Sequence, residues 1–144
     1  MPTWDIERIQ KNLQAIASHL PAGAKSFALS NWHYDPTHHQ CPHDAWLDSL
    51  VVEELASGER QQIRKIRIIL TLLGAYHDGR IQLSYEDVVR YSFEKPPSGN
   101  AHGDWLIDEV QLSPEGLAVH DIQFEKGRLR IECRDFTYSW TPFN

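Results

Sequence analysis

Five side chains of metal-binding type lie close together in one short stretch of the chain. This stretch of eleven residues contains His33, His38, His39, Cys41 and His43. Imidazole and thiolate are the ligands that zinc and related metals prefer, so these residues are the candidate ligands of a metal site. No cofactor other than zinc is expected. The first hypothesis for the stretch is a metal-binding protein or a metal-dependent hydrolase.

The spacing of these residues also fits a simpler interpretation. It contains no Cys-x-x-Cys pair and no His-x-x-x-His on a predicted helix, which are common spacings in zinc motifs. Two prolines, Pro36 and Pro42, indicate a loop. The alternative is therefore a solvated loop in which His43 and Asp44 only fix the start of the next strand.

A second candidate site is a group of carboxylates on the C-terminal strands. The group consists of Asp108, Glu109, Asp121 and Glu132. A turn at residues 113–116 places Asp121 opposite Asp108 or Glu109, and a turn at residues 125–127 places Glu132 opposite His120 or Asp121. Like charges that face one another across strands destabilise a sheet. A sheet that keeps them either spreads them into solvent or uses them.

The functional interpretation of these carboxylates is an acidic surface that binds a basic protein partner, such as a toxin, or a site for a divalent cation. Trp32 and Trp105 lie beside predicted loops and join this candidate partner-binding surface, because tryptophan is enriched at binding surfaces. The alternative is that bulges separate the carboxylates and that nearby arginines neutralise them, namely Arg128, Arg130 and Arg134. We expect Trp46, Tyr138 and Trp140 to lie in the core.

The composition and charge of the chain are those of a single acidic globular domain. The chain has 144 residues, 41% of them apolar, and a formal net charge of −6, which fits one globular domain over residues 1–144. Residues 1–72 carry 7 basic and 8 acidic side chains, whereas residues 73–144 carry 7 and 12. The acidity therefore belongs mainly to the C-terminal half, and it argues against a general nucleic-acid binder.

The apolar periodicity predicts the elements that position these residues. Apolar residues at steps of three and four predict an amphipathic helix over residues 1–22, with Thr3 as its N-cap and Pro21 as its stop. Residues 23–43 read as an irregular, His-rich region with a short strand within residues 25–34. Alternation then predicts six or seven antiparallel strands over residues 44–144.

These elements together predict an α+β fold that is mainly β. The N-terminal helix packs on a curved antiparallel sheet or a partly closed barrel that ends in a C-terminal β-meander. Alternation slips at residues 120–121 and again at residues 134–135, and each slip predicts a bulge. A closed barrel would also allow a third function, a small-ligand pocket in its interior.

The segment His43-Asp44-Ala45-Trp46-Leu47-Asp48-Ser49-Leu50 resembles a group of small bacterial β-rich proteins. These open a strand with a His-Asp-Ala step, and some of them are immunity-like. The resemblance implies no established activity and assigns no catalytic residue. The net charge of −6, the opposed carboxylates and the missing catalytic signature favour a non-enzymatic, immunity-like protein-binding module ahead of the metal-dependent protein. The chain shows no leader pattern, and its longest apolar run is too short to span a bilayer. We therefore expect a cytoplasmic protein with no membrane or nucleic-acid partner.

Overall fold

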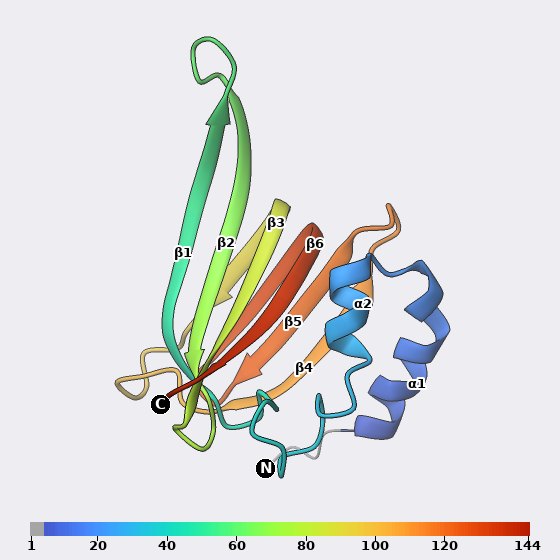
Figure 1. The fold of residues 1–144 in the computed structure, drawn as a ribbon, viewed down its shortest axis with the longest axis vertical. Coiled ribbons are helices and arrows are strands. Elements are labelled where there is room, and N and C mark those ends of the chain that lie inside the picture. Colours follow the sequence, from blue (N-terminus) through green and yellow to red (C-terminus); the bar gives the residue numbers. More distant parts are fainter. Residues whose placement is uncertain (1–4) are drawn as a thin grey trace.

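Helices precede all of the strands in the described part of the chain, residues 5–144 of a computed structural model (Figure 1). The elements are α1 (Ile6–Ile16), the 3-10 turn η1 (Ala17–His19), α2 (Ala22–Ala28), β1 (Trp46–Ser57), β2 (Ile63–Leu73), β3 (Gly79–Glu94), β4 (Trp105–Leu112), β5 (Ala118–Phe124) and β6 (Gly127–Pro142). This order confirms the predicted α+β, mainly β class. None of the helices within residues 5–144 is long and apolar enough to cross a membrane.

The N-terminal segment forms two α-helices rather than one helix and a strand. Asp5 caps α1, and its side chain accepts a hydrogen bond from the backbone N–H of Arg8 at 2.9 Å. The predicted cap, Thr3, lies outside the described residues. Pro21 does not end the helical region but precedes α2 as its N-cap residue. The strand predicted within residues 25–34 is wrong, because α2 and a series of turns occupy this range.

All six strands form one antiparallel sheet in the order β1-β2-β3-β6-β5-β4. The predicted C-terminal meander is therefore confirmed as β4-β5-β6. The sheet is not closed, and its edge strands approach each other only at one end, where Trp46 and Asp104 form an isolated bridge. At this end the backbone N–H of Trp105 also donates to the Ala45 carbonyl at 3.0 Å. Of the two predicted shapes, the structure supports the curved, open sheet.

The sheet bends across its two longest strands, β3 and β6. The register between them shifts between Val88 and Arg90, which leaves an extra residue on β3. The bulge predicted at residues 134–135 of β6 is therefore wrong in its position, because the extra residue lies on β3 between the partners of Cys133 and Glu132. The bulge predicted at residues 120–121 is wrong, because β5 pairs with β4 and β6 without a shift at these residues.

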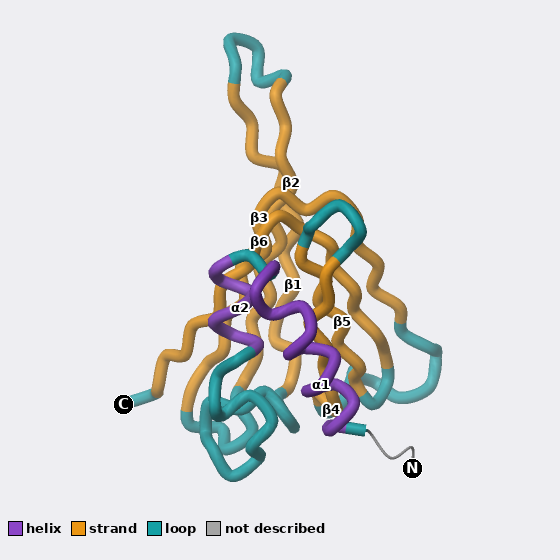
Figure 2. Tube along the Cα trace, turned by 90° about the vertical axis from the view of Figure 1, so that its right-hand side faces the viewer, coloured by secondary structure: helices purple, strands orange, loops and turns teal. Residues whose placement is uncertain are grey.

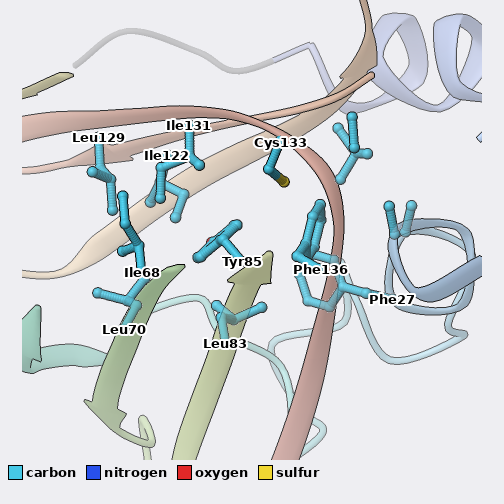
Figure 3. Close-up of a cluster of buried hydrophobic side chains, with 14 of the residues drawn as sticks. Phe27, Ile68, Leu70, Leu83, Tyr85, Ile122, Leu129, Ile131, Cys133 and Phe136 are labelled. Carbon is cyan, nitrogen blue, oxygen red and sulfur yellow. The ribbon is translucent and has the colours of Figure 1, made fainter. Parts of the chain in front are cut away.

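Apolar side chains fill the space between the two halves of the bent sheet (Figure 3). The first half contributes Ile68, Leu70 and Leu83, and the second half contributes Ile122, Leu129 and Ile131; all are fully buried. The alternation from which the strands were predicted is present in β2, where Ile68, Leu70 and Leu72 are buried and Ile69 and Thr71 are only partly buried. Because side chains fill this interior, the structure does not support a small-ligand pocket within the sheet.

Helix α2 covers the open side of the curved sheet. Phe27 of α2 is 2% exposed and packs edge-on against Phe136 of β6, with ring centroids 5.8 Å apart. The Asp135 side chain accepts hydrogen bonds from the backbone N–H groups of Gly23 and Ala24 at 3.0 and 2.9 Å. Asp135 thus accepts from free backbone donors at the start of α2. The N-cap residue directly before a helix usually plays this role.

The β1–β2 hairpin extends well beyond the rest of the sheet (Figures 1 and 2). Strand β2 pairs with β3 only over residues 68–73, so residues 63–67 pair with β1 alone. We call residues 53–67 the arm. An isolated two-stranded hairpin is marginally stable in water, so this arm depends on its attachment to the sheet.

Candidate functional site

The structure separates the five predicted metal ligands. His33 and Cys41 are buried, whereas His38, His39 and His43 are exposed. His39 contacts Asp78, and His43 lies 3.2 Å from Asp44. No three His, Cys, Asp or Glu side chains within residues 5–144 form a group that could hold a metal ion. Metal binding by this loop stays a prediction, and it would require the loop to rearrange.

A buried hydrogen-bond network joins two histidines through one carboxylate. Nε2 of His33 lies 2.8 and 2.9 Å from the two carboxylate oxygens of Asp108, and Nε2 of His120 lies 2.8 Å from one of them. Nδ1 of His120 is 2.7 Å from the hydroxyl of Tyr85, and Nδ1 of His33 is 3.1 Å from the Ala28 carbonyl. The network therefore ties the segment after α2 to strands β3, β4 and β5.

The partners in this network determine where its protons lie. Both neighbours of His33, the Ala28 carbonyl and the Asp108 carboxylate, are acceptors, so the form of the ring that satisfies both is the one with a proton on each nitrogen, which is the charged form. Burial alone would raise the pKa of Asp108, but the His33 charge and the hydrogen bonds from His120 and His33 hold that pKa well below its usual range. Asp108 and His33 therefore form a buried ion pair.

Each member of this network already has its hydrogen-bond partners. His120 donates from Nε2 to Asp108 and accepts the Tyr85 proton at Nδ1, and burial raises the pKa of Tyr85 well above its usual value. A general base needs a nitrogen or oxygen free to take a substrate proton. The geometry thus favours a role in holding the fold together.

A small pocket lies beside this network. It has a volume of about 280 Å³ and lies between α1, the His-rich loop and β4. His33, Tyr34, His43, Trp105 and Asp108 are among the residues that line it. The Tyr34 hydroxyl is taken, because it donates to the Asp108 carbonyl at 3.0 Å. The pocket is slightly smaller than typical small-molecule sites, which begin at about 300 Å³.

Both thiols of the described chain are free and buried. Burial raises the pKa of Cys41 to about 11 and that of Cys133 to about 12. The thiolate is the nucleophile, so these shifts suppress the reaction of either cysteine near neutral pH.

This leads to a labelling prediction. In the native protein at about pH 8, iodoacetamide should modify Cys41 and Cys133 at least about 100-fold more slowly than an ordinary thiol of pKa about 8.5. Mass spectrometry over time measures both rates. The variant Ser98→Cys places a thiol at an exposed position after β3 and serves as the control that should react at the ordinary rate. A native Cys41 that reacts as fast as this control would contradict the structure.

The predicted carboxylate group is split between the two faces of the sheet. Glu109 pairs directly with Asp121, as one of the two predicted registers has it. Glu132 lies opposite Val119, so its predicted partners, His120 and Asp121, are wrong by at least one residue. Asp108 is 2% exposed and faces the interior, where it cannot contact a partner.

Arginines cover the carboxylates that remain on the outer face. Nε of Arg128 donates to Asp121 at 2.9 Å, Arg130 lies 3.2 Å from the same carboxylate, and Arg8 of α1 lies 3.7 Å from Glu109. The alternative in which arginines neutralise the group is thus confirmed for Arg128 and Arg130. Arg134 donates instead to Asp87, at 2.6 Å.

In each of these pairs the arginine side chain is more exposed than the carboxylate side chain. The side chains of Arg8, Arg128 and Arg130 are between 45% and 53% exposed, whereas those of Glu109 and Asp121 are 18% and 15% exposed. The Arg90–Glu132 pair, 4.0 Å apart, shows the same difference, 82% against 19%. The solvent-exposed groups of these ion pairs are therefore mainly guanidinium groups. We call Arg8, Arg90, Arg128 and Arg130 with the carboxylates beneath them the outer charged face.

The tryptophans do not lie where the sequence placed them. Trp105 is 1% exposed and belongs to the core, so its prediction as a surface residue is wrong. Trp32 is half-buried and packs on Tyr138, with ring centroids 4.6 Å apart. Trp46, predicted in the core, is 46% exposed, and its indole N–H donates to Asp104 at 2.6 Å. Tyr138 and Trp140 pack against the core as predicted.

His120 and Tyr85 are the members of the buried network that sequence reasoning missed. The sequence pattern places His120 at a predicted bulge, as a candidate neighbour of Glu132, with no role in the interior. His120 lies two residues from the buried residues Ala118 and Ile122 and four from Phe124, which places it on their face, and this spacing could have identified it.

Comparison with known proteins adds no assignment. No protein-family model matches the chain, and no curated protein matches it. The resemblance to immunity-like bacterial proteins through the His-Asp-Ala step therefore stays an expectation. In this chain Asp44 of that step has a φ of 69°, and its backbone N–H donates to the Trp105 carbonyl at 2.8 Å. The step thus lies where the two sheet edges meet.

Proposed function

We propose that this protein is a non-enzymatic protein-binding module whose contact surface is the outer charged face. The observation that carries the proposal is the exposure difference described above, in which arginines lie over carboxylates. Arginine is enriched in binding surfaces because its planar guanidinium keeps free donors even when one edge is paired. The saturated network around Asp108 supports a role without catalysis.

The same exposure difference indicates the chemistry of the partner. The sequence favoured a basic partner, because it showed only the excess of acidic residues. A partner that approaches this face meets Arg90, Arg128 and Arg130 before it meets Asp121 or Glu132. An acidic protein surface is therefore the better complement. In an immunity-like role, that partner would be a toxin with an acidic contact surface.

A labelled poly-L-glutamate peptide tests this proposal by fluorescence anisotropy at low ionic strength. The double variant Arg128→Gln/Arg130→Gln should bind the peptide about tenfold more weakly, which is about 1.4 kcal/mol. Glu94 lies exposed on the same face opposite Arg128, so Glu94→Gln should strengthen binding. Arg60→Gln, at the tip of the arm, is the matched control and should leave binding unchanged.

Two outcomes would contradict the proposal. One is equal binding by all of these variants when circular dichroism shows that they are folded. The other is tighter binding of duplex DNA than of the peptide, which would indicate a nucleic-acid surface.

A further inference from the structure

The arm carries exposed apolar side chains on one face and charges that divide by strand. Residues that pair directly across the two strands share a face, which places Leu55 and Ile63 on the outer face together with Val51 at the base of the arm. The exposures of Val51, Leu55 and Ile63 are 46%, 38% and 51%. Large apolar residues grouped on a projecting hairpin are typical of an interaction surface.

The charges of the arm are separated between its two strands. Within the paired part of the arm, β1 carries the acidic residues Glu53 and Glu54, whereas β2 carries the basic residues Arg64, Lys65 and Arg67. On the outer face Glu53 lies 3.0 Å from Arg67, and Lys65 pairs with Leu55, so this face has its acidic residue on β1 and its basic residues on β2. Such a surface is complementary to itself if the β1 strand of one copy lies over the β2 strand of another.

We infer that two copies of this protein associate through the outer faces of their arms. Two hairpins related by a two-fold axis can meet in three ways: edge to edge, face to face about an axis across the strands, or face to face about an axis parallel to the strands. Edge-to-edge pairing brings β1 next to β1 or β2 next to β2. Face-to-face packing about an axis across the strands also places β1 over β1. Both bring like charges together. Packing about an axis parallel to the strands is the arrangement that places β1 over β2 of the second copy.

In that arrangement the contacts repeat at each level of the arm. Glu53 of each copy lies over Arg67 of the other copy. This follows because Glu53 and Arg67 are directly paired across the hairpin and so lie at the same position along it. Ile63 lies over Ser57, and Val51 lies over Ile69, so the exposed apolar side chains become covered. The contact is isologous, as expected for a dimer with closed symmetry. It uses a different surface from the outer charged face.

Sedimentation equilibrium tests whether the dimer forms. The wild-type protein should dimerise below about 100 µM, and Ile63→Ser should weaken the association at least about tenfold. Val52→Ser is the matched control, because Val52 is exposed to a similar extent, 42%, but faces the other side of the hairpin. A wild-type protein that stays monomeric over this range would overturn the inference and leave the proposed function intact.

A charge exchange tests the arrangement itself. The variant Glu53→Arg/Arg67→Glu keeps an opposite pair within its own arm and should still form its own dimer. Mixed with wild-type protein, it should form few mixed dimers, because Glu53 of the wild type would then lie over a glutamate at position 67. Native mass spectrometry counts the species. Mixed dimers in excess over the two pure dimers would show β1 over β1 and contradict the proposed geometry.

Discussion

Replacing Asp108 with asparagine is expected to lower the free energy of unfolding by about 3–5 kcal/mol, the usual cost of breaking a buried ion pair. Asparagine keeps the shape of the side chain, but its amide nitrogen is a donor and would face a histidine N–H. The charge of His33 would also lose its counterion in a site where both partners are at most 2% exposed. Urea unfolding followed by circular dichroism measures the change.

Glu109→Gln is the matched control for this variant. Glu109 is the next residue on β4, but it faces the outer side and interacts with Arg8 at a distance of 3.7 Å. An exposed pair of this kind contributes about 0–1 kcal/mol, so the control should lose little stability. If Asp108→Asn and Glu109→Gln lost the same amount, the buried network would not stabilise the fold as described.

The same variant should change how stability depends on pH. The pKa of Asp108 is lowered in the folded state, so its carboxylate stays ionised where the unfolded chain takes up a proton. The resulting stabilisation is complete above the pKa of an unfolded aspartate, about 3.9, and is lost as the pH falls further. Below about pH 4, wild-type stability should therefore fall more steeply than that of Asp108→Asn. Parallel curves would contradict this assignment.

Replacing Gly23 with alanine is expected to destabilise the protein by about 3 kcal/mol, at the upper end of overpacking costs. A Cβ atom at this position would lie 2.2 Å from the backbone carbonyl oxygen of Phe136, which cannot move without disturbing β6. The sign is informative, because a Gly to Ala change inside a helix normally stabilises it by about 1 kcal/mol. Thermal or urea unfolding measures the difference.

Lys25→Ala provides the comparison on the same helix, because Lys25 is exposed. It should change stability by less than about 0.5 kcal/mol. In Gly23→Ala, a further loss of stability comes from the cap of α2. A helix displaced by the added methyl group would lose the hydrogen bonds that the backbone N–H groups at positions 23 and 24 donate to Asp135. A Gly23→Ala protein as stable as the wild type would show that α2 does not pack this closely on β6.

The C-terminal strands could be predicted from the sequence because local signals define them. Short turns predicted at residues 113–116 and 125–127 join strands that alternate clearly, and the structure has β4, β5 and β6 on either side of these turns. The pairing of Glu109 with Asp121 follows from the same turn. These features depend on residues that are near one another in the chain, so a single sequence contains what is needed to predict them.

Helix α2 and the buried network could not be predicted in this way. Pro21 and Gly23 are local signals for the end of a helix, but Asp135, which caps α2, lies 112 residues from Gly23 in the chain. Asp108 looks like a surface acid until His33, 75 residues away, is known to contact it. A polar side chain in an alternating strand is assigned to the solvent face, and only its distant partners show that it is buried.

The sign of the charge that the outer face recognises can be measured most directly with two probes of opposite charge. Labelled poly-L-glutamate and poly-L-lysine peptides of equal length are titrated with the wild-type protein over a range of salt concentrations. The exposed arginines predict that the glutamate peptide binds more tightly and that its affinity falls as salt rises. Tighter binding of the lysine peptide would contradict the account and restore the basic partner that the sequence first favoured.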